Sequence, residues 1–216
     1  MKFETFLKTF RNQPVVDSQM LAPFREGNYG AVQLSRWVKE GKLVQLRRGF
    51  YTFTPNYLRV EPSALYIANM IYRPSYISLE RALAEYGLIP ESVPVITSVT
   101  TRRPTEFESV LGHFRYQHIK QDLFFGYYSR KTDTPETLLA FPEKAILDLM
   151  YFTPGPLTMD WMEEMRFQNL EEIHPERLLD FSKRFNQPKI QKAAALFLEF
   201  RRRILKEYKQ RQRTKS

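Results

Sequence analysis

The chain has no cysteine, so disulfide bonds and thiolate metal sites are excluded. It also has no apolar run near the ~18 residues that a transmembrane helix needs, and residues 1–6 lack the apolar core of a signal peptide. From these absences we expect a cytoplasmic protein that does not associate with a membrane. Its 216 residues allow one large or two small domains.

Residue types that commonly carry catalysis are few or scattered. Three histidines are present, and His113 and His118 lie an odd number of residues apart on one predicted strand, so they face opposite sides of a sheet. His174 is distant from both in sequence. The eight glycines form no glycine-rich phosphate loop. The sequence therefore predicts no metal site, no cofactor and no catalytic histidine pair.

Acidic residues offer the main enzymatic alternative. The candidates for a nuclease-like cluster are Glu80, Glu85, Asp122, Glu143 and Asp148, together with Lys144. A nuclease of that type would place an Asp before a Glu-x-Lys motif on a strand, and the sequence has no such arrangement. Glu143 and Lys144 are more simply explained as first-turn and solvent-facing residues of a helix. We therefore expect that the protein is not an enzyme.

The net charge of +9 is unevenly distributed along the chain. Residues 1–55 contain nine Lys or Arg against four Asp or Glu, and residues 183–216 contain twelve against two, whereas residues 56–182 contain twelve against eighteen. Basic ends attract a polyanion such as DNA. The acidic middle would be repelled by DNA, and it better suits a protein partner or plain solvation.

A helix followed by a β-hairpin is predicted between residues 28 and 53. The helix has an apolar stripe of helical period, made of Ala31, Leu34, Trp37 and Val38. Asn28 is its predicted N-cap, and Gly41 ends it. Residues 43–48 then alternate between two faces, Gly49 allows the chain to reverse, and residues 50–53 return as an aromatic strand.

The elements before this segment complete a DNA-binding motif. A first amphipathic helix is predicted from the spacing of Phe3, Phe6, Leu7 and Phe10. Asp17 is expected to cap a short second helix that contains Met20 and Leu21. Two helices, a recognition helix and a wing form a winged helix-turn-helix, here predicted for residues 1–55. The alternative is a solvated helix beside an ordinary polar hairpin.

The candidate DNA-contacting residues lie on the polar side of the recognition helix, in the helix before it and in the wing. They are Ser18, Gln19, Asn28, Tyr29, Gln33, Arg36, Lys39, Arg47 and Arg48. Arg and Gln read guanine and adenine edges in a major groove, so Gln33 and Arg36 are candidates for base contacts. Arg47 and Arg48, at the predicted hairpin tip, suit phosphates or a minor groove.

A second domain is expected over residues 56–216, after a linker near residues 54–56. Helices are predicted to begin at Pro62 and after Ser78, which is the expected N-cap, and Gly87 closes the second of them. The predicted strands are residues 95–101, 113–119 and 123–128.

These strands predict a small antiparallel sheet at about residues 94–128. Pro142 suits the first turn of a helix, and a helical bundle is predicted over about residues 142–210, with its last helix starting near Pro188. Together with the N-terminal domain, this organisation predicts an α+β fold.

Aromatic residues near the predicted sheet offer a further alternative. The set is Tyr116, Phe124, Phe125, Tyr127 and Tyr128. Such rings can stack on RNA bases. Aromatic strand residues belong more often to a protein core, and the acidic balance of this region also disfavours RNA.

Four motifs occur in order along the chain. They are residues 41–51 (GKLVQLRRGFY), 76–83 (YISLERAL), 97–103 (TSVTTRR) and 142–149 (PEKAILDL). This ordered set resembles the AbiEi family, antitoxins of type IV toxin–antitoxin or abortive-infection systems, over roughly residues 30 to 152. One departure is Phe141, where the family pattern leads us to expect a hydroxyl residue that caps the helix.

The resemblance implies an N-terminal winged helix that binds double-stranded operator DNA and represses its own operon. Inverted repeats in the operator would recruit two copies. It also implies a C-terminal antitoxin domain that counteracts a nucleotidyltransferase-like toxin without stably binding it. Arg102 and Arg103 follow a predicted strand and are candidates for the antitoxin surface, although a solvated turn is the simpler explanation. The alternative function is a winged-helix regulator whose C-terminal domain senses a ligand or binds a partner protein.

Overall fold

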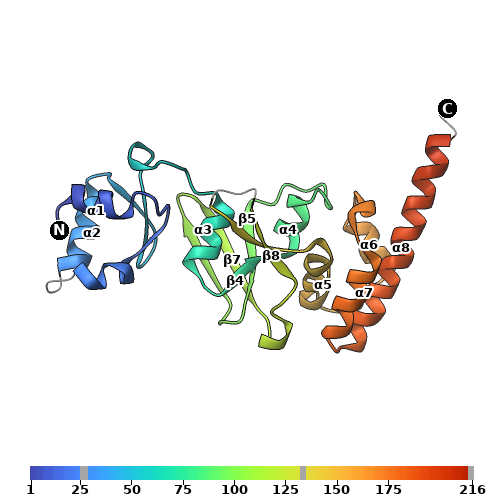
Figure 1. The fold of residues 1–216 in the computed structure, drawn as a ribbon. Helices are drawn as coiled ribbons and strands as arrows, with labels where there is room; N and C mark the ends of the chain where they lie inside the picture. The colour runs from blue at the N-terminus through green and yellow to red at the C-terminus, as the bar shows by residue number, and fades with distance from the viewer. Residues whose placement is uncertain (25–28, 132–134, 214–216) are drawn as a thin grey trace.

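The computed structural model describes residues 1–24, 29–131 and 135–213. A three-stranded sheet near the N-terminus is followed by a six-stranded sheet and then by helices. Figure 1 shows α1 and α2 at one end of the molecule, the larger sheet in the middle, and α5 to α8 at the other end. The predicted α+β fold class is confirmed.

Helices and a small sheet share the first part of the chain. The helical segments are α1 (Phe3–Phe10), the 3-10 helix η1 (Ser18–Phe24), α2 (Tyr29–Lys39) and the 3-10 helix η2 (Pro55–Tyr57). The strands are β1 (Val16–Asp17), β2 (Leu43–Arg47) and β3 (Phe50–Phe53), paired antiparallel in the order β1-β3-β2. The predicted first helix and the hairpin are present, whereas β1 was not predicted because two residues show no alternation.

The second predicted helix is a 3-10 helix and not an α-helix. It contains Pro23, which has no backbone N–H to donate. Asp17 does cap its start, since Asp17 Oδ1 accepts the Gln19 N–H at 2.9 Å. The capping prediction at Asp17 is therefore confirmed.

Helix α2 ends as the sequence predicts. Gly41 has a φ of +67°, in the left-handed region that glycine adopts without steric cost. The Gly41 N–H donates to the Val38 carbonyl at 3.0 Å, and the Lys42 N–H donates to the Trp37 carbonyl at 2.9 Å. These two bonds satisfy carbonyls that the helix end leaves open.

The apolar stripe of α2 is narrower than predicted. Leu34 and Trp37 are buried, and the Trp37 ring lies 4.8 Å from that of Phe6 on α1. Ala31, predicted to belong to the stripe, is exposed, because the buried contacts lie further along the helix. Asn28, the predicted N-cap, lies outside the described residues.

The larger sheet has six strands in the order β6-β7-β5-β4-β9-β8. They are β4 (Ser75–Ile77), β5 (Val95–Thr100), β6 (Thr105–Ser109), β7 (Gly112–His118), β8 (Tyr127–Arg130) and β9 (Thr137–Ala140). Strands β5 and β7 run parallel, as do β4 and β9, whereas the other neighbouring pairs are antiparallel. The sheet is therefore mixed, and the prediction of an antiparallel sheet was wrong.

The third predicted strand, residues 123–128, was also placed wrongly. The 3-10 helix η3 (Gln121–Leu123) occupies its start, and strand pairing begins at Tyr127. Of the rings weighed above for RNA stacking, Tyr116 and Phe125 are buried, and the other three are half-buried and pack on neighbouring rings. Tyr127 stacks on Tyr76 with centroids 4.6 Å apart, and Tyr128 stacks on Phe141 at 4.9 Å. They therefore do not form an open platform for bases.

The remaining helices belong to the C-terminal segment. They are α3 (Ala64–Ile71), α4 (Leu79–Glu85), α5 (Pro142–Phe152), α6 (Met159–Glu164), the 3-10 helix η4 (Leu170–Glu172), α7 (Pro175–Arg184) and α8 (Pro188–Arg213). Helix α3 packs on β4, β5 and β9, and α5 connects the sheet to α7 and α8. Pro142 stands at the first turn of α5, as predicted.

A fully buried polar network lies between β4 and α5, and it corrects the sequence prediction. Lys144 and Asp148, one helical turn apart, form an ion pair with no exposed surface. The Asp148 carboxylate also accepts the hydroxyls of Tyr76 at 2.9 Å and Ser78 at 2.8 Å, and Lys144 Nζ donates to the Tyr76 oxygen at 2.8 Å. Lys144 is therefore not solvent-facing. Ser78 does precede α4, but it makes no capping bond because its hydroxyl is used here.

Besides Asp148, two of the carboxylates considered for a nuclease site, Glu143 and Glu85, are engaged separately. Glu143 is also fully buried, so its predicted exposure was wrong. It accepts the His174 backbone N–H at 2.7 Å and the Arg177 guanidinium at 3.3 Å, whereas Glu85 pairs with Arg130 at 2.9 Å. Within residues 1–24, 29–131 and 135–213, no group of three or more His, Cys, Asp or Glu is arranged to hold a metal ion.

Two hydrophobic clusters organise the molecule. The smaller cluster gathers α1, α2 and the N-terminal sheet around Phe6, Trp37 and Phe53. The larger cluster runs through the six-stranded sheet and the C-terminal helices, and it also includes Val15 and Leu46 from the N-terminal segment. Residues 1–55 therefore pack against the rest of the chain through Leu46 of β2 and Val15, which precedes β1.

Candidate nucleic-acid interface

The outward face of α2 is open to solvent and carries two basic side chains. With Leu34 and Trp37 turned inward, the opposite side of the helix presents Ser35, Arg36 and Lys39. A shallow surface hollow follows this face and also includes Ala31 and Val32. Gln33 is half-buried at the edge of this face. A helix with one side on a core and a basic opposite side has the form that enters a major groove.

Arg36 is not entirely free on this face. Its Nε donates to Glu40 Oε1 at 2.7 Å, and Lys42 Nζ lies 2.8 Å from Glu40 Oε2. The hydrogen bonds from Lys42 and Arg36 hold the pKa of Glu40 below its ordinary value. The side chain of Arg36 is nevertheless 71% exposed. Sequence reasoning missed this pair, although Arg36 and Glu40 have the i,i+4 spacing that favours one.

The turn between β2 and β3 carries the second candidate group. Arg48 is exposed there, beside Gly49, which has a φ of +89°. The Ser18 N–H donates to the Gly49 carbonyl at 2.7 Å, so the start of η1 lies against this turn. Ser18 is half-buried, and Gln19 next to it is exposed. Tyr29 forms the first residue of α2.

Arg47 does not occupy the hairpin tip in the way that the sequence predicts. Its guanidinium lies over the rings of Phe50 at 4.9 Å, Phe107 at 4.7 Å and Tyr72 at 5.7 Å. Desolvation by these neighbours lowers the pKa of Arg47. The strand register shifts between Gln45 and Arg47, and a bulge of this kind changes the side to which the following side chains point. Arg47 therefore faces the C-terminal segment, which does not suit a phosphate contact.

Replacing Arg47 by Ala is expected to lower the free energy of unfolding by about 2 kcal/mol, because it removes the contacts of a partly desolvated guanidinium with three aromatic rings. Urea denaturation followed by tryptophan fluorescence would measure this. The matched change at the exposed Arg48 should cost less than about 0.5 kcal/mol. Equal, small losses for the two variants would contradict the packing role of Arg47.

The two arginines considered for an antitoxin surface lie at the same junction. The Arg102 guanidinium stands 4.4 Å from the centre of the Tyr72 ring and donates to the Arg73 carbonyl at 3.3 Å. The Tyr72 hydroxyl donates to the Arg103 carbonyl at 2.8 Å. Both arginines are exposed. Tyr72 therefore has Arg47 of the N-terminal segment and Arg102 of the C-terminal segment beside the same ring.

The chain matches no protein-family model, and no curated protein matches it. Within the parts of the chain that the structure describes, no helix combines the length and the apolar character needed to cross a membrane.

Proposed function

We propose that the protein is a DNA-binding autorepressor and antitoxin, the function that the AbiEi resemblance implies. In this proposal α1, η1 and α2 are the helices of a winged helix-turn-helix, and the β2–β3 hairpin is its wing. The observation that carries the DNA-binding part is the outward face of α2. Leu34 and Trp37 fix this helix on a core, while Arg36 and Lys39 stay exposed.

The proposed contacts differ in what they recognise. Arg36 has the planar guanidinium group that reads a guanine edge. It would make this contact either while it stays paired with Glu40 or after it exchanges the Glu40 carboxylate for the base. Lys39 and Arg48 suit phosphates, which give affinity without sequence preference. The basic balance of residues 1–55, nine Lys or Arg against four Asp or Glu, supports a polyanionic partner.

Replacing Arg36 by Ala is expected to weaken binding to the promoter of its own operon by about 1–3 kcal/mol and to leave binding to random duplex nearly unchanged, if Arg36 contacts a base. Fluorescence anisotropy with the two duplexes, at several salt concentrations, would measure both affinities. Arg48→Ala should instead weaken both duplexes alike and lower the salt slope by about 1. A wild-type protein that binds promoter and random DNA equally would exclude the repressor proposal.

The antitoxin part of the proposal concerns the C-terminal segment, and it follows from the motifs at residues 76–83, 97–103 and 142–149. The acidic balance of residues 56–182 gives this segment a charge that DNA repels. The test is co-expression with the product of the adjacent gene, scored by growth. Rescue of growth, with no stable complex on co-purification, is the expected result.

A further inference from the structure

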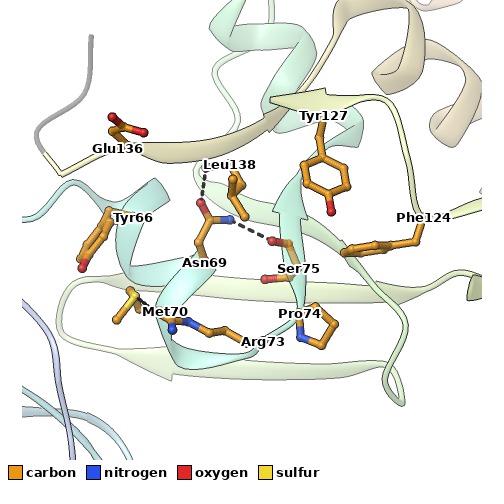
Figure 2. A pocket seen from close by; sticks show the side chains of 10 residues that line it. All are labelled: Tyr66, Asn69, Met70, Arg73, Pro74, Ser75, Phe124, Tyr127, Glu136 and Leu138. Atoms are coloured by element: carbon orange, nitrogen blue, oxygen red, sulfur yellow. Dashed lines mark hydrogen bonds between the residues drawn. The ribbon is translucent and has the colours of Figure 1, made fainter. Parts of the chain in front are cut away.

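A pocket of about 420 Å³ opens on the C-terminal segment, between α3 and the strands β4, β8 and β9 (Figure 2). It is lined by Tyr66, Asn69, Met70, Arg73, Pro74, Ser75, Phe124, Tyr127, Glu136 and Leu138. This volume falls within the range of small-molecule sites in proteins. The network around Lys144 and the candidate DNA interface use none of these side chains.

Aromatic rings form two sides of the pocket. Phe124 and Tyr127 meet edge to face, with centroids 5.2 Å apart, and Tyr127 is supported from behind by its stacking on the buried Tyr76. In Figure 2, Tyr66 lies on the other side of Asn69 and Ser75 from these two rings. Tyr66, Phe124 and Tyr127 are all half-buried, so each keeps part of its ring accessible. Ring faces and edges of this kind favour a planar aromatic ligand.

The floor of the pocket is fixed by one buried amide. Asn69 on α3 donates through Nδ2 to the Ser75 carbonyl of β4 at 3.5 Å, and its Oδ1 accepts the Leu138 N–H of β9 at 2.7 Å. Figure 2 shows both bonds crossing the floor between the rings. A site held in this way is formed before a ligand arrives, which lowers the entropic cost of binding.

The rim carries one cation and one anion, on different sides. Arg73 is exposed and contacts the Met70 sulfur, and it forms no ion pair within the described part of the chain. Glu136 is also exposed, and its carboxylate accepts the Ser129 hydroxyl. In the view of Figure 2, Arg73 lies at the lower side of the pocket and Glu136 at its upper left. An Arg fork binds a carboxylate in bidentate fashion, and a carboxylate accepts from a hydroxyl or amine.

We propose that this pocket binds a small, elongated aromatic carboxylate, with its ring system between Tyr66 and the Phe124–Tyr127 pair, its carboxylate on Arg73, and a hydroxyl or amine donor directed to Glu136. This binding goes beyond the proposed DNA-binding and antitoxin functions. Its test requires neither DNA nor a toxin, so the two proposals succeed or fail separately.

The test is a calorimetric titration of the full chain with 6-hydroxy-2-naphthoate, which has a planar two-ring body with a carboxylate at one end and a hydroxyl at the other. Saturable binding at one site is expected. The corresponding amide, 6-hydroxy-2-naphthamide, should bind about tenfold more weakly, since a hydrogen bond to a charged group is lost. A titration of the carboxylate that does not saturate would overturn the proposal.

Arg73→Gln should weaken 6-hydroxy-2-naphthoate about tenfold and remove the preference for the carboxylate over the amide. The loss of that preference identifies Arg73 as the carboxylate-binding group, because a general distortion of the pocket would weaken both probes. Arg202→Gln is the matched control, since Arg202 is an exposed arginine on α8 whose Nε bonds only to a carbonyl of its own helix in the described residues. Equal affinity of Arg73→Gln and wild-type protein for the carboxylate would overturn the proposal. A Tyr66→Leu variant should bind both probes more weakly, with a cooperative thermal melt showing that this variant is folded.

Discussion

Replacing Asp148 by Ala is expected to lower the free energy of unfolding by about 3–5 kcal/mol, because it leaves the Lys144 ammonium buried without a counter-charge. Asp148 is the acceptor for three donors, namely Lys144, Tyr76 and Ser78. Burial and the neighbouring carboxylate hold the pKa of Tyr76 well above its ordinary value, so Tyr76 stays protonated and donates. The loss is a large fraction of the 5–15 kcal/mol that stabilises a typical domain.

Urea denaturation of the full chain would measure this effect, and a double variant supplies the control. Lys144→Met with Asp148→Leu removes both charges and keeps an apolar filling, so it should cost much less than Asp148→Ala alone. The remaining loss in the double variant comes from Tyr76 and Ser78, whose hydroxyls lose their acceptor. If the single and double variants are equally destabilised, the cost lies in packing and not in the uncompensated charge.

Elements with a strong local period were predicted closely. Helix α2 was expected between the N-cap Asn28 and Gly41, and it runs from Tyr29 to Lys39, with its end set by Gly41. Helix α8 likewise begins at Pro188, where its start was predicted. In each case the amphipathic spacing and the capping residue are close together in sequence, so the information needed is local.

The mixed sheet required information that no local pattern contains. Strand β4 has three residues, all buried, and therefore shows no alternation between faces. Its parallel partner β9 lies about 60 residues further along the chain, with Ile77 opposite Leu139. Packing of α3 and α5 on the sheet decides this pairing. The order of the strands therefore depends on contacts between residues that are far apart in the sequence.

Charged residues were misjudged where the helix around them is buried. Lys and Glu are normally exposed, and Glu143 and Lys144 were assigned by that rule. Residues 145–147 and 149–150 are all apolar, which predicts a helix buried on every side. Any charge within such a helix must be paired, and the i,i+4 spacing of Lys144 and Asp148 provides the pair. Arg47 was misjudged for another reason, since the bulge after Gln45 is not visible in the alternation of the strand.

Under the proposed function, a variant that cannot bind DNA is expected to keep the proposed antitoxin activity. Arg36→Ala combined with Arg48→Ala removes the proposed base contact and the exposed arginine of the hairpin turn, and leaves Arg47 in its aromatic site. This variant should lose repression of its own promoter and still protect cells from the cognate toxin when expressed from an unrelated promoter. The structure gives the physical reason: these two arginines are exposed, whereas Val15, Leu46 and Arg47 pack against the remainder of the chain.

The measurements are a reporter assay for repression and a growth assay for protection, made with equal amounts of protein. Arg36→Lys combined with Arg48→Lys is the matched control. It keeps both charges but lacks the guanidinium fork, so it should retain non-specific DNA affinity and lose operator preference. Cooperative thermal melting must first establish that each variant folds, because loss of a domain would imitate loss of a site. A folded and abundant Ala variant that fails to protect would mean that neutralisation depends on DNA binding, and the assignment of the two activities to separate surfaces would be wrong.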